Sequence, residues 1–241
     1  MHAVWEQLRA GISLIFDGNE LILSLTWTTI RVAFVSTAIA LVIGLPIGVA
    51  IGIGRFRGRR ALQLLANASL ALPPVVVGVL ALLLMVPGSV FGSLRIEFTL
   101  TAVYIVQAIL ALPYIVAFTP AAIQALPPGL LAQARALGAG RGQVSVLAVR
   151  EARIGIMAAV IAAMAATVAE VGAVVIAGGN IVGSDQTLAS GLLDSFLLTA
   201  GNPQLIAITI MLVLLLVILL GTLTFLQQRS GGIQLRFRTA A

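Results

Sequence analysis

Uncharged, apolar stretches recur along the whole chain, and each is long enough to cross a lipid bilayer. About 20 apolar residues let a helix span the hydrocarbon core. In this chain of 241 residues, 60% are hydrophobic, 9% are charged and the mean hydropathy is +1.14, whereas a water-soluble domain carries roughly a quarter charged residues. The sequence therefore predicts an all-α polytopic membrane protein.

Breaks in the apolar pattern predict five transmembrane helices. We expect an N-terminal interfacial segment at 1–19, a transmembrane domain at 20–228 and a tail at 229–241. The spans are placed at about 20–54, 61–86, 98–126, 154–179 and 204–226. Pro73-Pro74 should kink or interrupt the second span, because proline removes a backbone donor. Gly178-Gly179 should end the fourth span.

Three glycines of the first span predict where it packs. Gly44, Gly48 and Gly52 recur every four residues, twice giving G-x-x-x-G. In a membrane helix this spacing makes a smooth face that lets another helix approach closely.

Arginine positions predict the orientation, because arginine near the ends of spans marks the cytoplasmic side. With five spans and the N-terminus outside, eleven of the 14 arginines fall in cytoplasmic segments, only Arg9 and Arg95 fall outside, and Arg31 lies within the first span. Six of the eight acidic residues fall outside. We expect a multi-pass protein of the cell membrane (inner or plasma) with a cytoplasmic C-terminus. The net charge of +6 then needs no nucleic-acid partner.

The residue types that are missing exclude most catalytic chemistry. The chain has no cysteine, a single histidine at His2, and 14 arginines but no lysine. These absences exclude cysteine nucleophiles, a Ser-His-Asp triad or zinc site, a Schiff base and the P-loop lysine that ATP hydrolysis would use. We expect a non-enzyme without a cofactor or metal of its own.

One polar segment on the cytoplasmic side, AQARALGAGRGQVSVLAVREAR at 132–153, interrupts the apolar pattern. Residues 130–137 and 141–149 have the pattern of short helices separated by Gly138-Ala139-Gly140. We call residues 130–150 the elbow and predict that it forms an exposed knob, which receives mechanical work from a separate ATPase. Its arginines can also be interpreted as positive-inside charges that face lipid.

Three polar residues near or within the spans are candidates for a pathway or gate. Glu170 is the sole acid well inside a span, where a carboxylate costs at least about 2.5 kcal/mol. It either lines a path or clamps two helices through hydrogen bonds. Arg31 lies about 16 Å along its helix and either snorkels outward, pairs with Glu170 or contacts an anionic substrate. Asn180 either donates hydrogen bonds near the outer mouth or belongs to a plain helix cap.

At the elbow the chain resembles the permease subunits of ABC importers. Their signature is an EAA triplet, a glycine four residues on, and an I-x-L-P ending. Here Ala132-Gln133-Ala134 precedes Gly138, so that the third alanine and the glycine match. Ala132 replaces the glutamate, and Arg150-Glu151 replaces leucine-proline.

The chain more closely resembles the tungstate-type branch of these permeases, which is related to molybdate permeases. The resemblance rests on four motifs in order, namely LPPVVVG at 72–78, LGA at 137–139, VREAR at 149–153 and EVGAV…GGNI at 170–181. It implies a molybdate/methionine-permease-like fold and an importer of a tetrahedral oxyanion. Tungstate is the expected substrate, with molybdate, sulfate or another small solute as alternatives.

The resemblance also implies partners and residue roles. The partners are a second permease copy, two cytoplasmic ATPase subunits that hold ATP and Mg, and an extracytoplasmic oxyanion-binding protein. The residues expected to couple to the ATPase are Ala132, Gln133, Ala134, Arg135, Leu137, Gly138, Ala139, Arg141, Arg150 and Glu151. Those expected at the path or gate are Arg31, Pro73, Pro74, Glu170, Gly172, Gly178, Gly179 and Asn180. The alternative of another class is a self-contained helical channel or secondary carrier.

Overall fold

The computed structural model describes residues 2–198 and 202–238, and this part of the chain is helical without a strand. The prediction of an all-α protein is confirmed. The elements in chain order are α1 (His2–Phe16), α2 (Glu20–Ile53), α3 (Arg59–Ser69), α4 (Pro74–Met85), the 3-10 helix η1 (Gly92–Leu94), α5 (Leu100–Gln124), α6 (Leu130–Ala136), α7 (Arg141–Glu151), α8 (Arg153–Ala169), α9 (Gly172–Gly178), α10 (Leu188–Leu198) and α11 (Pro203–Arg238).

Three described helices are long and apolar enough to cross a membrane: α2, α5 and the part of α11 at Pro203–Thr222. The number rises to five if two bent pairs each count as one span. These pairs are α3 with α4, bent by 102°, and α7 with α8, bent by 69°. Five spans are thus the upper bound that length and composition allow.

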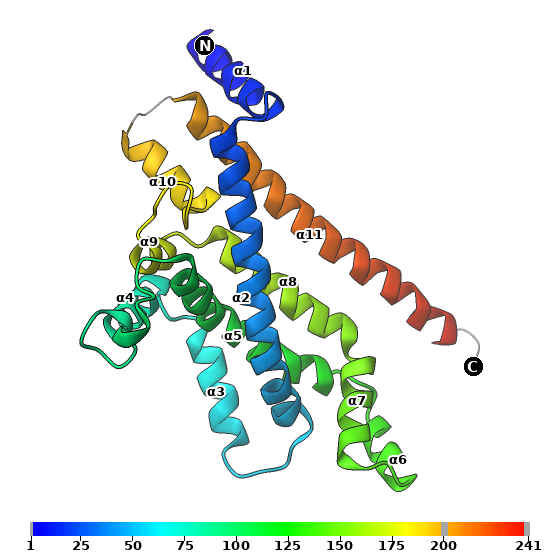
Figure 1. The fold of residues 1–241 in the computed structure, drawn as a ribbon. Helices are drawn as coiled ribbons and strands as arrows, with labels where there is room; N and C mark the ends of the chain where they lie inside the picture. Colours follow the sequence, from blue (N-terminus) through cyan, green and yellow to red (C-terminus); the bar gives the residue numbers. More distant parts are fainter. Residues whose placement is uncertain (1, 199–201, 239–241) are drawn as a thin grey trace.

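The centre of the bundle is the contact between α2 and α5, which lie side by side (Figure 1). A methyl group added at each of three glycines of α2 would lie 2.7–3.0 Å from a residue of α5, pairing Gly44 with Ile115, Gly48 with Thr119 and Gly52 with Ile123. From one pair to the next, the residue number increases by four in both helices. The two helices therefore run in the same direction. The close-packing glycine face predicted for the first span is therefore confirmed.

The second predicted span is broken at its prolines, as expected. Between Ser69 and Pro74 the chain turns, and Pro73 caps α4 in an extended conformation. After the 102° bend, α4 lies at one side of the bundle (Figure 1). Tandem prolines lack the N–H groups that would continue the helical ladder, so the helix restarts in a new direction.

The fourth predicted span also differs from an unbroken helix at about 154–179. The helix α8 ends at Ala169 and α9 begins at Gly172. Between them Glu170 is extended at φ −79° and ψ 131°, and its Oε1 accepts a hydrogen bond of 3.0 Å from the backbone N–H of Ala173. The carboxylate thus replaces a backbone acceptor for the first turn of α9.

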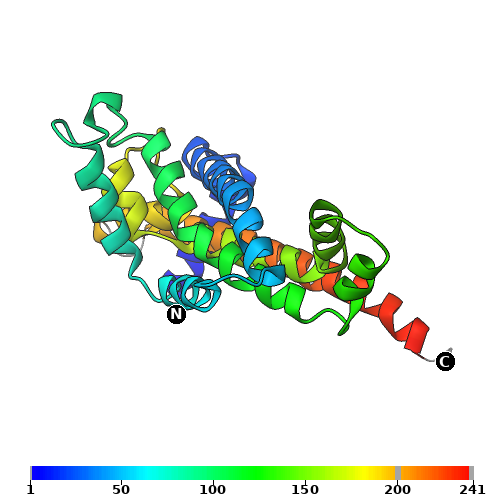
Figure 2. The same ribbon diagram turned by 90° about the horizontal axis from the view of Figure 1, so that it is seen from below.

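The C-terminal helix extends beyond the predicted span. We expected it to end near residue 226, whereas α11 continues to Arg238. It runs away from α2 along its length, and its last turns project from the rest of the bundle (Figures 1 and 2). Of the predicted tail at 229–241, residues 239–241 lie outside the described part, as do the side chains of Arg229, Arg236 and Arg238.

The end of the bundle opposite the elbow is closed by α1 and α10. A methyl group at Gly11 of α1 would lie 2.8 Å from Ile206 of α11. Leu188 at the start of α10 packs with Leu25 and Ile208 in one buried cluster. The N-terminal segment predicted at 1–19 therefore contains a helix that packs on the start of α11, at the opposite end of α2 from the elbow (Figure 1).

Candidate functional site

The elbow projects from one end of the bundle as two short helices, α6 and α7 (Figure 1). Gly138 ends α6 in the left-handed conformation at φ +89°. The N–H of Ala139 donates to the carbonyl of Ala134 at 3.0 Å, and the N–H of Gly138 donates to that of Arg135, also at 3.0 Å. This pair of bonds is the Schellman motif, which favours glycine because a Cβ is strained at positive φ.

One face of the elbow is anchored in the bundle. Val144 and Ala148 of α7 are fully buried, and Ala148 packs with Val49 of α2, Ile123 of α5 and other buried residues. A hydrogen bond of 2.8 Å from the N–H of Gly140 to Gln143 Oε1 fixes the start of α7. The elbow is therefore packed against the C-terminal parts of α2 and α5.

The other face of the elbow is free of contacts with the bundle. Leu137 is 89% exposed, and no atom lies within 4 Å of a methyl group built at Gly138. Most of the predicted coupling residues are exposed, namely Ala132, Gln133, Arg135, Leu137, Gly138, Arg141, Arg150 and Glu151, while Ala134 and Ala139 are half-buried. The elbow is thus an exposed, glycine-hinged knob.

A cavity of about 210 Å³ lies between the breaks of the two interrupted helices and α5. It is lined by Ser69, Leu70, Leu72 and Pro74 at the first break, by Gln107, Leu110 and Tyr114 of α5, and by Ala166, Thr167, Ala169 and Glu170 at the second break. The structure therefore brings two of the predicted gate residues, Pro74 and Glu170, to one cavity. Pro73 lies beside Pro74 and is exposed.

Sequence reasoning missed Gln107, which lines this cavity. Its side chain is fully buried, and neither Nε2 nor Oε1 has a hydrogen-bond partner among the described residues. A buried amide without a partner costs about 1–3 kcal/mol. The signal was present in the sequence, because Gln107 is a carboxamide in the middle of an apolar span, where polar residues usually have a function.

The two helices that follow the breaks cross at very short distance. A methyl group at Gly78 of α4 would lie 2.9 Å from the Cα of Ala173 in α9. On the other side of the crossing, a methyl group at Gly172 of α9 would overlap Val75 of α4. Gly172, predicted from the EVGAV motif, is thus a packing glycine at the crossing of α4 and α9.

The remaining glycines of the predicted gate belong to a cap at the end of α9. Gly179 and Asn180 have positive φ of +90° and +58°. The N–H groups of Asn180 and Ile181 donate to the two oxygens of Asp185, at 3.0 and 2.9 Å. A Cβ at Gly178 would overlap Asp185 Oδ2.

Asp185 was counted only as one of the six acidic residues expected outside, and its side chain is fully buried. Burial raises the pKa of its carboxyl, and the N–H groups of Ile181 and Asn180 lower that pKa in part. Nothing in the sequence distinguished Asp185 from the other loop acids, because its burial depends on the turn that brings it back to α9.

Among the described residues, no ion pair joins the last two polar candidates, Glu170 and Arg31. Glu170 makes the hydrogen bond to Ala173 described above, which fits a structural acid, and it also lines the cavity, which fits a path residue. Arg31 is exposed on α2, one residue before Val32, which packs with Val103 of α5 and Val174 of α9.

Comparison with known proteins gives the family and the fold. The family described as "Binding-protein-dependent transport system inner membrane component" matches residues 44–231, which include both broken helices and the elbow. A probable anion ABC transporter permease protein of Haloferax volcanii is 34% identical over 166 residues, which cover 69% of this chain and 72% of the relative. The tungstate uptake system permease protein TupB of Peptoclostridium acidaminophilum is 26% identical over 90% of this chain and 94% of its own length.

A chain of the inward-facing MetNI methionine ABC transporter has the same fold, with a TM-score of 0.70 and 23% identity. The match covers 88% of this chain and 96% of that chain. The expected methionine-permease-like architecture is therefore confirmed.

Proposed function

Because the chain belongs to the family of binding-protein-dependent transport system inner membrane components, we propose that it is the translocating subunit of an ATP-driven importer for tungstate. Relatives named as tungstate, molybdenum and anion permeases support an oxyanion as the substrate class. The relative named for tungstate aligns over nearly its full length. Without a lysine, the chain has no P-loop of its own, so an ATPase subunit would supply the energy.

The elbow is the observation that carries the proposal. Its outer face, with Leu137 and the turn at Gly138, is free to enter a groove of the ATPase, and its inner face is packed on α2 and α5. Closure of two ATPase subunits would draw two elbows together. Because packed helices transmit displacement with little compression, the inner ends of α2 and α5 would follow.

The gate is assigned to the two broken helices. At Pro73-Pro74 and at Glu170 the backbone hydrogen-bond ladder is already interrupted, so that α4 and α9 can tilt without the loss of further bonds. Such breaks act as hinges when they absorb large changes in φ and ψ. Gly178, Gly179 and Asn180 form the outer cap, and the exposed Arg31 is a candidate for contact with the anion.

Three partners follow from this mechanism. A second copy of the permease would complete the path, because five spans are few for an enclosed route. An extracytoplasmic binding protein would deliver the anion, because the acidic outer segments repel a dianion. With the N-terminus outside and the C-terminus cytoplasmic, the elbow faces the ATPase.

Reconstitution tests the proposal. The chain would be co-purified with its ATPase, incorporated in proteoliposomes with the binding protein outside, and assayed for tungstate, molybdate and sulfate by mass spectrometry of the metal or sulfur. We expect tungstate to accumulate above equilibrium only with ATP inside. Uptake to equilibrium without ATP would instead indicate a channel or a secondary carrier. A preference for molybdate or sulfate would change the proposed substrate, but the protein would still be assigned to an ATP-driven importer.

A further inference from the structure

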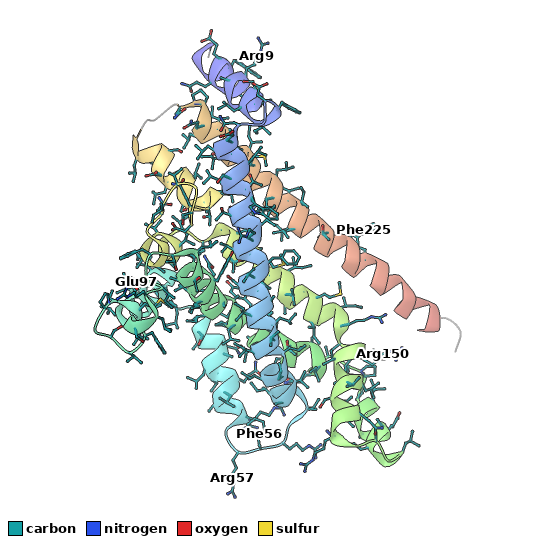
Figure 3. The ribbon with its side chains drawn as sticks, in the orientation of Figure 1. Arg9, Phe56, Arg57, Glu97, Arg150 and Phe225 are labelled. Atoms are coloured by element: carbon teal, nitrogen blue, oxygen red, sulfur yellow. The ribbon has the colours of Figure 1, made fainter. Side chains whose placement is uncertain are left out.

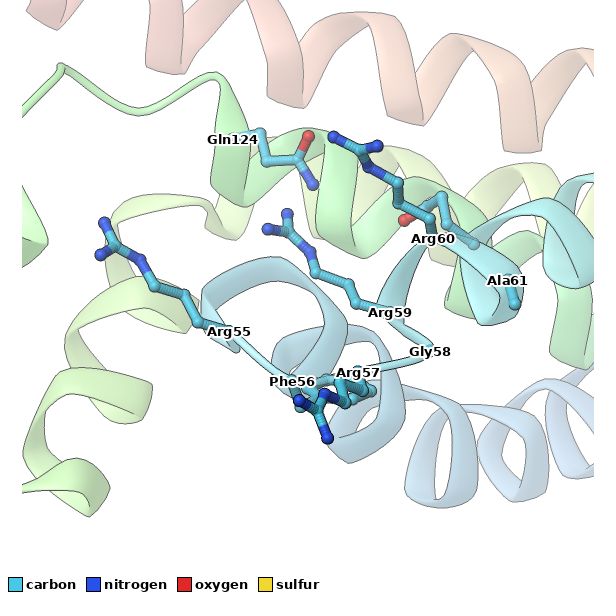
Figure 4. A pocket seen from close by; sticks show the side chains of 9 residues that line it. Arg55, Phe56, Arg57, Gly58, Arg59, Arg60, Ala61 and Gln124 are labelled. Carbon is cyan, nitrogen blue, oxygen red and sulfur yellow. The ribbon is translucent and has the colours of Figure 1, made fainter.

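A basic cavity of about 900 Å³ lies at the loop between α2 and α3. It is lined by Arg55, Phe56, Arg57, Gly58, Arg59, Arg60, Ala61, Gln63 and Gln124 (Figure 4). Four of these residues are arginines and none is acidic. Like charges at such short spacing repel one another, so the loop is stabilised by any anion that enters the cavity.

The side chains of this loop point in different directions. Arg59 and Arg60 extend toward the carboxamide of Gln124 at the end of α5 (Figure 4). Arg57 turns away from Gln124 and points out from the end of the molecule (Figures 3 and 4). Two guanidinium groups beside a carboxamide are suited to an oxyanion, because each guanidinium presents a planar fork of N–H donors.

The surface next to this cavity is apolar. On α3, Leu62, Leu64 and Leu65 are 43%, 68% and 63% exposed. Leu65 lies five residues after Arg60, which is only about 7–8 Å along the helix axis. In a membrane protein these leucines face hydrocarbon, so the guanidinium groups lie at the depth of the lipid headgroups.

We propose that this cavity binds the phosphate of an anionic phospholipid, with Arg59, Arg60 and Gln124 as its ligands and the acyl chains along the leucines of α3. A phospholipid carries both a phosphate for the guanidinium groups and acyl chains for the exposed leucines of α3, whereas a free tetrahedral oxyanion has no group that would contact those leucines. The positive N-terminal end of α3, whose cap Gly58 has no side chain, adds to the attraction. The arginines of this loop would then bind a lipid in addition to setting the orientation of the protein in the membrane.

Spin-label electron paramagnetic resonance tests the site on the full chain in phosphatidylcholine bilayers. Spin-labelled phosphatidylglycerol and phosphatidylcholine report how strongly the protein prefers the anionic lipid. We expect a clear preference, lowered about fivefold by Arg59→Gln or Arg60→Gln, since each arginine near a membrane surface contributes on the order of 1 kcal/mol. The matched control Arg57→Gln removes the same charge from the same loop and should leave most of the preference.

Three results would overturn the proposal. An equal loss in Arg57→Gln would mean that only the total charge matters. No preference in the unmodified protein would mean that no site exists. Displacement of the lipid by millimolar inorganic phosphate or tungstate would mean that the cavity takes a free oxyanion. Unchanged helix content and thermal midpoint in each variant exclude misfolding. The assay uses no ATP and no transported solute, so its outcome is independent of the proposed import activity.

Discussion

Gly138 shows how one residue sets the shape of the elbow. Its φ of +89° costs any other L-residue about 1–2 kcal/mol, yet a methyl group there would touch nothing. We therefore predict that Gly138→Val lowers ATP-driven tungstate uptake strongly while the protein still reaches the membrane. The reason is backbone strain that opens the Schellman turn. Uptake and membrane abundance, measured on the same vesicles, check this.

The matched control for Gly138 is Gly142, on the same elbow. It is exposed within α7, and a methyl group there also touches nothing. Because its backbone is helical, Gly142→Ala should keep uptake and add about 0.5–1 kcal/mol of helix stability. Normal uptake in Gly138→Val would remove the coupling role of this turn, since that substitution changes only the turn.

Gln107 provides a second test at the scale of a residue. Replacing its side chain by the isobutyl group of leucine in Gln107→Leu removes two polar atoms that lack partners among the described residues. We predict a gain of about 1–3 kcal/mol in the free energy of unfolding, together with a loss of uptake if the amide serves the path. Thermal unfolding in detergent and uptake in vesicles separate the two effects.

The control for Gln107 is Leu110→Met, which lines the same cavity. A volume-conserving change of this kind costs less than about 1.5 kcal/mol and should leave uptake near normal. A Gln107→Leu protein that transports normally would show that the cavity is a packing defect and not part of the gate.

At the scale of the helices, the crossing of α4 and α9 depends on glycine. The Cβ of Gly78→Ala would meet the backbone of Ala173 at 2.9 Å, so one of the two helices must move. We predict a loss of about 1–3 kcal/mol in stability, as in other overpacked sites, and slower uptake. In Gly221→Ala of α11, where a methyl group touches nothing, stability should rise slightly. Thermal unfolding in detergent measures both effects. Equal thermal midpoints for Gly78→Ala and Gly221→Ala would contradict the close contact between α4 and α9.

Features with a local cause could be predicted at this scale. The break at Pro73-Pro74 follows from missing N–H groups, the end of α6 follows from Gly138, and the glycine face of α2 follows from a four-residue repeat. Each of these three features depends only on residues that are close together in the sequence. The structure has all three.

Features that depend on a side chain turning back to cap the backbone were not predicted. The break after Ala169 contains no proline and depends on Glu170 turning back to Ala173. The burial of Asp185 depends on the turn that brings its carboxylate to Asn180. The sequence indicated a helix through the first and placed the second only in an outside segment, because composition and periodicity do not specify which side chain will cap the backbone.

At the scale of the molecule, the elbow and α1 lie at opposite ends of α2 (Figure 1). The helix α2 has 34 residues, about 51 Å at 1.5 Å per residue, which exceeds the hydrocarbon thickness of about 30 Å. We therefore expect its two ends to stand on opposite sides of the membrane. Five spans with the N-terminus outside would place the elbow and the arginine loop inside.

The absence of cysteine makes this orientation directly measurable, because any introduced thiol is unique. Leu137→Cys on the elbow and Ser184→Cys in the loop before α10 both replace exposed side chains. We predict that a membrane-impermeant maleimide labels Ser184→Cys in intact cells, and labels Leu137→Cys only in inverted vesicles. Denatured samples serve as the control for total thiol. Labelling of both positions from one side would mean that the segments between them cross the membrane an even number of times, which would overturn both the five-span topology and the assignment of the elbow to the ATPase side.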